Sequence, residues 1–493
     1  MTDVPIVPRA SEARRVPLKL RTTLGYSAGQ LLESIINNAL SVFLLFYVTV
    51  VCGMPGALAG AALSVGLVVD AVMDPLIGSL SDGWRSRWGR RLPFMMVGIA
   101  PVAIAFVLIF MLPSRWPTVL LAVWLAALSI VMRVSMSLFI LPYQAVGAEL
   151  SDDYAERSSI MAWRWGMGQI GTVLAIFLGF GVFLAGKNGL SNRAAYLPFA
   201  ICMAVIFTIG ALISARTVGG NLDRQHTQPA PTGRLHTRLM RDLRDVAQHR
   251  SFQILFIGAL FFFVALGVFA ALGLHANTFF WRLQASQIQI VTLALFGGLL
   301  AGAPFAGPLL TRFEKRTILM VGMAGLAGGE GLPATLRLLG LLPLTGDKLV
   351  LLLSLINFIA GALMAAASIA FASMMADAAD EHEHLFGARR EGLFFAGWSF
   401  ASKAATGAGA LISGLILQAI AFPTDLAAHG GVNAILPTHM IALLGFFYGP
   451  ATAVVTLAAV FVTWFYRLDR LAHADILNDL DMRRAADPAN PAF

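Results

Sequence analysis

The sequence predicts an all-α membrane protein with twelve transmembrane helices. Hydrophobic residues make up 58% of the 493 residues and charged residues only 13%, about half the charged share of a soluble globular domain. Apolar runs long enough to span a bilayer, about 20 residues, recur from Leu24 to Tyr466 with short polar breaks between them. A soluble core could not bury this much apolar surface, so membrane insertion is the first expectation.

The apolar runs place the individual helices. We predict them at residues 24–51, 57–81, 93–113, 118–150, 159–185, 194–216, 252–280, 287–311, 317–340, 348–375, 392–421 and 439–466. Each run is long enough to cross the hydrocarbon core once.

The longest polar break divides the chain into two six-helix halves. We expect an N-terminal tail at 1–23, an N-terminal half at 24–216, a central loop at 217–250, a C-terminal half at 251–466 and a C-terminal tail at 467–493. A residual repeat supports the division, since one motif follows the second predicted helix and a weaker counterpart follows the eighth: Gly78-xxx-Asp82 with Gly89-Arg90-Arg91, and Gly307-xxx-Thr311-Arg312 with Glu314-Lys315-Arg316. Repeated halves are typical of alternating-access carriers.

The basic residues set the orientation. With the N-terminus inside, 25 Lys and Arg residues fall in cytoplasmic segments and five on the opposite side. Because cytoplasmic loops carry an excess of Lys and Arg, we predict a multi-pass protein of the cell inner (plasma) membrane with the loop at 217–250 and both tails in the cytoplasm. This placement accounts for the net charge of +8 without nucleic acid. The long basic N-terminal region before a full-length apolar run does not resemble a signal peptide.

Two carboxylates inside a predicted helix are the strongest functional signal. A charge at the centre of a membrane helix costs at least about 2.5–3.5 kcal/mol, so each such residue is a candidate site. Asp70 and Asp74 are spaced i, i+4 and therefore share one helical face. Oxygen ligands suit a hard cation such as Na⁺, and a proton could equally be shared by the pair. The alternative is that one Asp only pairs with an Arg or Lys from another helix.

Other polar residues in predicted helices are candidates for binding a solute. Glu33 and Asn37 form a polar stripe on the first helix, which faces either a cavity or another helix. Arg164 lies between two tryptophans, one of them Trp165, and Trp398 precedes Lys403 by five residues. Aromatic faces with fixed donors suit a polyhydroxylated ring or an anion, although tryptophans are also common at membrane interfaces.

Two further segments carry simpler expectations. His382 and His384 are expected in a solvated turn, and the glycines around Glu330 predict a weakened or broken ninth helix. The chain has no nucleophile elbow, phosphate loop or zinc spacing, so we expect no enzyme, no cofactor and no metal beyond Na⁺.

Motifs in both halves resemble those of one transporter family. Asp70-x-x-x-Asp74-Pro75-x-x-Gly78-x-x-x-Asp82, followed by Arg87-Trp88-Gly89-Arg90-Arg91-x-Pro93, looks like the glycoside–pentoside–hexuronide:cation symporters, the melibiose permease branch of the major facilitator superfamily. Further matches follow in the same order: Leu141-Pro142-Tyr143, Glu149-Leu150, Asp153-Tyr154-x-Glu156-Arg157, Arg164, Asp377-x-x-Asp380-Glu381, Gly387-x-Arg389-x-Glu391-Gly392 and Lys403.

The resemblance implies the major facilitator fold and roles for particular residues. Asp70 and Asp74 would bind the coupling cation, with Lys403 close by and Ser137 completing the site. Arg164 would contact sugar. The charged motif residues are expected to take part in gating: Asp82, Arg90, Arg91, Glu149, Arg157, Asp377 and Arg389. The two acidic residues that grip galactoside in melibiose carriers fall here at Ser34 and near Ile140, so the resemblance does not extend to galactoside specificity.

We therefore predict a secondary active transporter that couples Na⁺ or H⁺ to the symport of a small polar solute, namely a sugar, glycoside or uronide. Its expected partners are that solute and membrane lipids, without nucleic acid, and the expected state is a monomer. Alternatives are a cation-coupled lysolipid or amphiphile carrier and, from another class, a membrane-embedded transferase or a sensor that binds without transport.

Overall fold

The computed structural model describes residues 18–84, 86–151, 153–186, 188–221, 248–387, 391–424, 426 and 430–486. The regular structure in these ranges is helical, without a strand. Nine of the described helices are long and apolar enough to cross a membrane. The chain is thus a multi-pass membrane protein, as predicted, while the number of twelve crossings stays a prediction.

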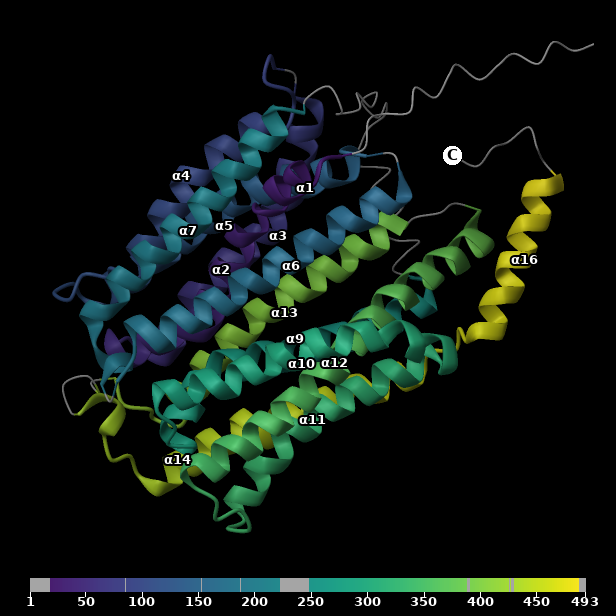
Figure 1. Cartoon of the computed structure of the whole chain (residues 1–493). Helices are drawn as coiled ribbons and strands as arrows, with labels where there is room; N and C mark the ends of the chain where they lie inside the picture. The colour runs from purple at the N-terminus through teal and green to yellow at the C-terminus, as the bar shows by residue number, and fades with distance from the viewer. Residues whose placement is uncertain are drawn as a thin grey trace, which may run out of the picture.

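The N-terminal part of the bundle consists of seven α-helices and short π- or 3₁₀-helical segments (Figure 1). They are α1 (Leu20–Ser27), α2 (Gln30–Ala39), η1 (Leu40–Leu44), η2 (Tyr47–Val51), α3 (Gly56–Gly83), α4 (Leu92–Ile109), α5 (Thr118–Glu149), α6 (Tyr154–Leu178), η3 (Gly179–Phe183), η4 (Gly189–Ser191) and α7 (Arg193–Gly219).

The C-terminal part follows residues 222–247, which lie outside the described ranges. It comprises α9 (Arg250–His275), η6 (Ala276–Phe280), α10 (Ala285–Arg312), α11 (Lys315–Leu338), α12 (Gly346–Phe386), α13 (Glu391–Ala419), η7 (Gly431–Asn433), α14 (Thr438–Phe446), η8 (Phe447–Ala451), α15 (Thr452–Trp464) and α16 (Arg470–Ala486).

Two local expectations were wrong. The helix predicted at 348–375 continues to Phe386, so His382 lies inside α12, 2% exposed and stacked on the ring of Phe386 at 4.7 Å. The glycine-rich stretch around Glu330 does not break α11. Its glycines let neighbouring helices approach closely, since a Cβ on Gly322 would collide with α12.

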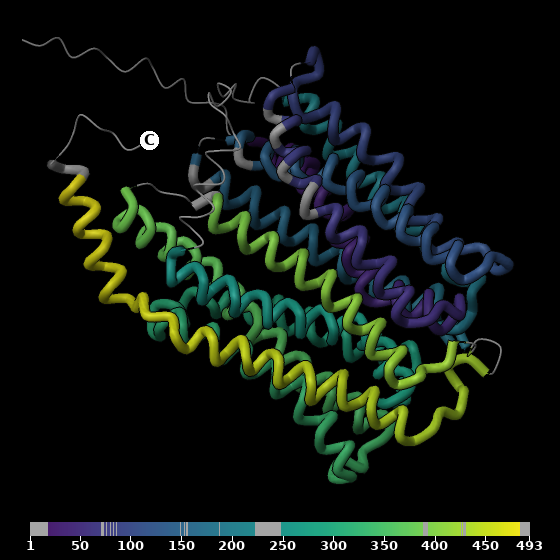
Figure 2. The backbone as a smooth tube through the Cα atoms, turned by 180° about the vertical axis from the view of Figure 1, so that it is seen from behind, coloured from purple at the N-terminus to yellow at the C-terminus, as the bar shows by residue number. Residues whose placement is uncertain are grey.

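Helices α1–α7 pack chiefly among themselves, and so do α9–α15 (Figures 1 and 2). The two groups meet mainly where α3 packs on α13, and also where α9 packs on η1 and α10 on α6. Residues from both groups can therefore face one another along the middle of the bundle.

One end of the bundle is sealed by contacts between the two groups; we call it the closed end. Gly56 at the start of α3 lies against Gly414 near the end of α13, so close that a Cβ on either would collide with the backbone of the other. Thr49 Oγ1 lies 2.8 Å from His275 Nε2. The ring of Phe46 packs on His275 with centroids 5.1 Å apart.

The other end, which we call the charged end, carries ion pairs within each group. Arg90 and Arg91 both reach Glu149 Oε1, at 2.6 and 2.7 Å. Lys315 Nζ lies 2.6 Å from Asp377 Oδ2. Helix α16 lies at this end against α12 (Figure 1), and together these contacts hold each group as a unit.

The glycine contact at the closed end leads to a stability prediction. Gly414→Ala places a methyl group against the α3 backbone, and overpacking of this kind costs about 1–3 kcal/mol. We expect the midpoint of thermal unfolding in detergent to fall by several degrees. Gly328→Ala in α11 is the matched control: a Cβ there meets no atom within 4 Å, and Ala favours a helix over Gly by about 0.5–1 kcal/mol. Equal midpoints for wild type and Gly414→Ala would contradict the tight contact.

Candidate functional site

Four side chains from three helices meet in the middle of the bundle. Asp70 and Asp74 lie one turn apart on α3, and Ser137 Oγ of α5 is 2.7 Å from Oδ1 of each. A hydroxyl carries one proton, so Ser137 donates to one carboxylate at a time. Lys403 Nζ of α13 lies 3.1 Å from Asp70 Oδ2 and also contacts Asp74 Oδ2. We call these four residues the central cluster.

Burial distinguishes the two carboxylates. The side chain of Asp70 is 0% exposed, whereas those of Asp74 and Lys403 are 19% and 29% exposed. Asp74 and Lys403 line a cavity, but Asp70 does not. The cluster therefore has a sealed side at Asp70 and an accessible side at Asp74.

Small residues let α3 and α13 come close enough for the ion pair to form. Gly407 lies one turn after Lys403, and a Cβ at that position would come within 3.0 Å of Leu67 Cβ, one turn before Asp70. Gly66 similarly lies against Ser129 of α5. The absence of side chains at these two glycines brings the three helices together around the carboxylates.

A second pair of charges lies near the central cluster. Arg133, one turn before Ser137 on α5, is within electrostatic range of Asp70, Asp74 and Glu33. Glu33 Oε2 accepts a hydrogen bond of 2.7 Å from Gln30 Nε2. The two basic side chains, Arg133 and Lys403, carry two positive charges when protonated. The three acidic side chains carry three negative charges when ionised, so one negative charge is left without a counterion in this group.

A cavity of about 580 Å³ lies beside the central cluster and is lined by both groups of helices. Most of its polar lining bears hydroxyl or amide groups, including Asn37, Gln144 and Ser402, and Trp398 supplies an aromatic wall. Drug-sized ligands occupy pockets of about 300–1,000 Å³. The cavity can therefore hold a small polar molecule against the accessible side of Asp74.

Only some of the predicted substrate-binding residues line this cavity. Glu33, Asn37 and Trp398 line it, whereas Ser34, Arg164 and Trp165 do not. The Ser34 hydroxyl donates to the Gln30 carbonyl of its own helix at 3.0 Å.

The two α6 candidates face elsewhere. Arg164 lies beside the hydroxyl of Tyr26, and Trp165 is 46% exposed.

The predicted gating residues lie toward the charged end where the structure describes them. Glu149 forms ion pairs with Arg90 and Arg91, and Asp377 forms one with Lys315. Arg157 Nε donates to the Ser151 carbonyl at 2.6 Å. Arg389 and the side chain of Asp82 lie outside the described residues.

The site also includes residues to which the sequence argument assigned no binding or gating role, although it counts Arg133 among the intramembrane charges that are candidate site residues. Arg133, Gln144 and Ser402 all line the cavity. A signal existed for Arg133, because it is a charge within an apolar run at i−4 from Ser137 and must share its helical face. No such sequence signal existed for Gln144 and Ser402, since isolated amides and hydroxyls are common in membrane helices.

Comparison with known proteins gives the family. The sequence profile described as MFS/sugar transport protein matches residues 25–470. An uncharacterized symporter of Synechocystis sp. is 26% identical, with 95% of this chain and 97% of that protein aligned. A glucuronide carrier protein homolog of Escherichia coli is 25% identical, with 95% and 96% aligned. The structure of a D-xylose-proton symporter matches with a TM-score of 0.60 at 15% identity, covering 91% of this chain and 97% of that one.

The profile and the relatives extend through both groups of helices, and the solved structure has the same fold. The resemblance predicted from the motifs is thereby confirmed. The chain belongs to the MFS/sugar transport protein family, has the major facilitator fold and is a membrane transporter, not an enzyme.

Proposed function

We propose that the chain is a cation-coupled sugar symporter in which one monovalent cation binds at the central cluster and a sugar binds in the adjacent cavity. The observation that carries this proposal is the contact of Asp70 and Asp74 with Ser137 and Lys403 inside the bundle, with Asp70 fully buried. Two carboxylates share one lysine, so a single added cation makes the cluster neutral.

Charge neutralisation provides the coupling. To change the side on which the cavity opens, the carrier passes through a state in which water is excluded from the cluster. A net charge moved into such a state costs several kcal/mol, and a bound cation removes that cost. Because Lys403 comes from α13 and the aspartates from α3, the same cation also changes the force between the two groups of helices.

Either Na⁺ or H⁺ fits the cluster. Carboxylate and hydroxyl oxygens are suitable ligands for Na⁺, and a proton on Asp74 would neutralise the accessible side. Asp74, rather than the sealed Asp70, is the first contact for a cation arriving through the cavity.

A sugar suits the cavity by its chemistry. Asn37, Gln144 and Ser402 can exchange hydrogen bonds with hydroxyl groups, while the indole of Trp398 offers a flat apolar face to a pyranose ring. Arg133 adds a fixed cation for a ring hydroxyl or a uronate. We assign Glu33 and Asn37 to substrate binding on this basis.

The orientation follows from the basic residues. The positive-inside rule assigns the charged end to the cytoplasm, and the cavity lies on that side of the contacts at Phe46 and His275. In this conformation a solute would exchange with the cytoplasm of a cell whose inner membrane holds the protein.

An amphiphile is the second candidate substrate. A further cavity of about 350 Å³, lined largely by apolar side chains such as Phe269, Phe296 and Met364, shares Ser41 and Thr406 with the sugar cavity. It offers space for an apolar tail. Competition distinguishes the two candidates: a lysolipid that blocks sugar uptake only above its micelle-forming concentration is not a ligand.

Asp74→Asn tests the coupling. We expect proteoliposomes with wild-type protein to accumulate a member of a sugar panel under an imposed Na⁺ or H⁺ gradient, and Asn at position 74 to reduce this uptake at least about ten-fold because it cannot supply the negative charge. The ion whose gradient drives uptake is the coupling ion. Uptake by Asp74→Asn that the same gradient still drives would refute the proposal.

Ser137→Ala tests the role of the hydroxyl. Hydrogen bonds to charged groups contribute about 1.5–3 kcal/mol, so the cation concentration for half-maximal uptake should rise about 10- to 100-fold. Ser135→Ala is the matched control on the same helix, since that buried hydroxyl donates to the Val131 carbonyl at 2.6 Å. Similar effects of the two substitutions would argue against a cation contact at Ser137.

A further inference from the structure

An unpaired carboxyl group lies in the C-terminal group of helices, outside the central cluster. Glu330 of α11 is 6% exposed, and neither of its side-chain oxygens has a hydrogen-bond partner among the described residues. It borders the largely apolar cavity of about 350 Å³ that adjoins the sugar cavity, whereas none of the four residues of the central cluster does. An ionisable side chain inside a membrane protein is costly and marks a candidate functional site.

No basic side chain balances this carboxyl group within the cavity. The described residues that border the cavity include no lysine, arginine or histidine, and Tyr448 of η8 is the other one that can titrate. The Tyr448 hydroxyl lies within electrostatic range of Glu330. Helices α10, α12 and α15 also pack on α11 and bring no charged side chain to the cavity. Because an unpaired carboxylate is costly to bury, Glu330 is a neutral acid when the cavity holds no cation.

Helix α12 brings an amide to the same level as Glu330. The adjacent Gly329 packs between Ile356 and Ala360 of α12, since a Cβ on it would lie 3.2 and 3.4 Å from their side chains. Asn357 therefore lies beside Glu330 along the helix pair, and both residues border the cavity. A cation placed between these two helices can contact both side chains.

Two aromatic rings also lie close to Glu330. A Cβ on Gly449 would come within 3.0 Å of the Glu330 carbonyl oxygen, so the preceding residue, Tyr448, is held next to this part of α11. The ring of Phe269 of α9 stacks on that of Tyr448 with centroids 4.6 Å apart, and both residues border the cavity. Aromatic rings attract organic cations, most strongly where water is excluded.

Two amides at the cavity have already used their donors. Asn357 Nδ2 donates to the Leu353 carbonyl at 2.8 Å. Asn38 Nδ2, from α2, donates to the Ser34 carbonyl and to the Thr172 hydroxyl, each at 2.8 Å. The amide oxygens are left as acceptors, like the oxygens of an ionised carboxylate. An ammonium group, which has three N–H donors and no acceptor, complements such a set.

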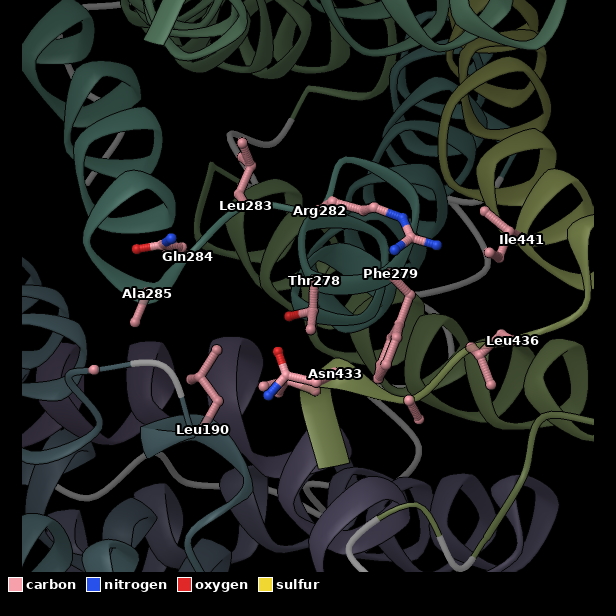
Figure 3. A pocket seen from close by; sticks show the side chains of 13 residues that line it. Leu190, Thr278, Phe279, Arg282, Leu283, Gln284, Ala285, Asn433, Leu436 and Ile441 are labelled. Carbon is pink, nitrogen blue, oxygen red and sulfur yellow. The ribbon is translucent and has the colours of Figure 1, made fainter. Parts of the chain in front are cut away.

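A second pocket, at the closed end, lacks this convergence. Its volume is about 250 Å³, and Thr278, Arg282 and Asn433 are among the residues that border it. Figure 3 shows the Arg282 guanidinium turned toward Ile441 and away from Thr278 and Asn433. The polar groups of that pocket therefore do not meet on one small molecule.

We propose that the cavity at Glu330 is a binding site for an organic primary ammonium ion with an apolar body. Glu330 pairs with the ammonium group, Asn357 accepts a hydrogen bond from it, and Phe269 and Tyr448 supply the aromatic wall. The ammonium ion takes the place of the Glu330 proton, which passes to the solvent, so the net charge in the cavity stays at zero. This ligand class goes beyond the proposed function, and its binding needs no cation at the central cluster.

Calorimetric titration of the full-length protein in a neutral detergent tests this site. The probe is phenethylamine, a cation at neutral pH, with phenethyl alcohol as its uncharged analogue and detergent solution as the blank. We expect the amine to bind to wild type and to release about one proton, detected as a dependence of the heat on the ionisation enthalpy of the buffer. Glu330→Gln should weaken binding at least about ten-fold and abolish the proton release, and Phe269→Leu should weaken binding about five-fold.

Two further variants localise the binding. Asp347→Asn is the matched control, because it removes an exposed carboxylate at the start of α12 that does not border the cavity. Asp74→Asn removes the accessible carboxylate of the central cluster. Both should bind the amine with wild-type affinity. Because no transport is measured, failure of this site and failure of coupled uptake remain distinguishable.

The proposal is overturned if phenethylamine does not bind to wild type, if the alcohol binds equally tightly, or if Asp74→Asn abolishes binding. Retention of wild-type affinity by Glu330→Gln also overturns it. If Glu330→Gln lowers the unfolding midpoint, Phe269→Leu and the proton release by wild type provide the test, and wild-type affinity in Phe269→Leu together with no proton release overturns the proposal.

Discussion

The contact of Lys403 with Asp70 and Asp74 is the interaction on which the rest of the structure depends. Three ionisable side chains in the middle of an apolar bundle are stabilised by lying against one another and Ser137. These contacts require α3, α5 and α13 to approach closely. The approach is possible because Gly66 and Gly407 have no side chains where the helices cross. The cavity then forms on the side where the carboxylates are not sealed.

The sequence predicted the central cluster because its signal is local. Asp70 and Asp74 are one turn apart in an apolar run, and their cost in a membrane requires a partner that only a few basic residues could provide. The long apolar helices were predictable for the same reason. The family motifs added Ser137 and Lys403, which spacing alone could not connect across 67 and 329 residues of chain.

Features set by contacts distant in sequence could not be predicted. The glycine-rich composition of α11 indicates a weak helix. The helix is nevertheless continuous, because the glycines let it pack closely against α12. His382 looks solvated in an acidic stretch, yet α12 extends past the apolar run and buries the imidazole against Phe386. The pocket at Thr278 and Asn433 forms only where segments more than 150 residues apart meet, and neither segment carries a motif.

The two ends of the bundle are held by different kinds of contact. At the charged end, ion pairs join helices within each group, whereas at the closed end, α3 and α13 touch through the backbones of Gly56 and Gly414. A contact made of backbone atoms and aromatic rings presents no ions to be desolvated when it forms or rehydrated when it parts. The free energy of opening and closing this end should therefore be nearly independent of ionic strength. The closed end would then block the passage of solutes equally well at low and at high external salt concentration.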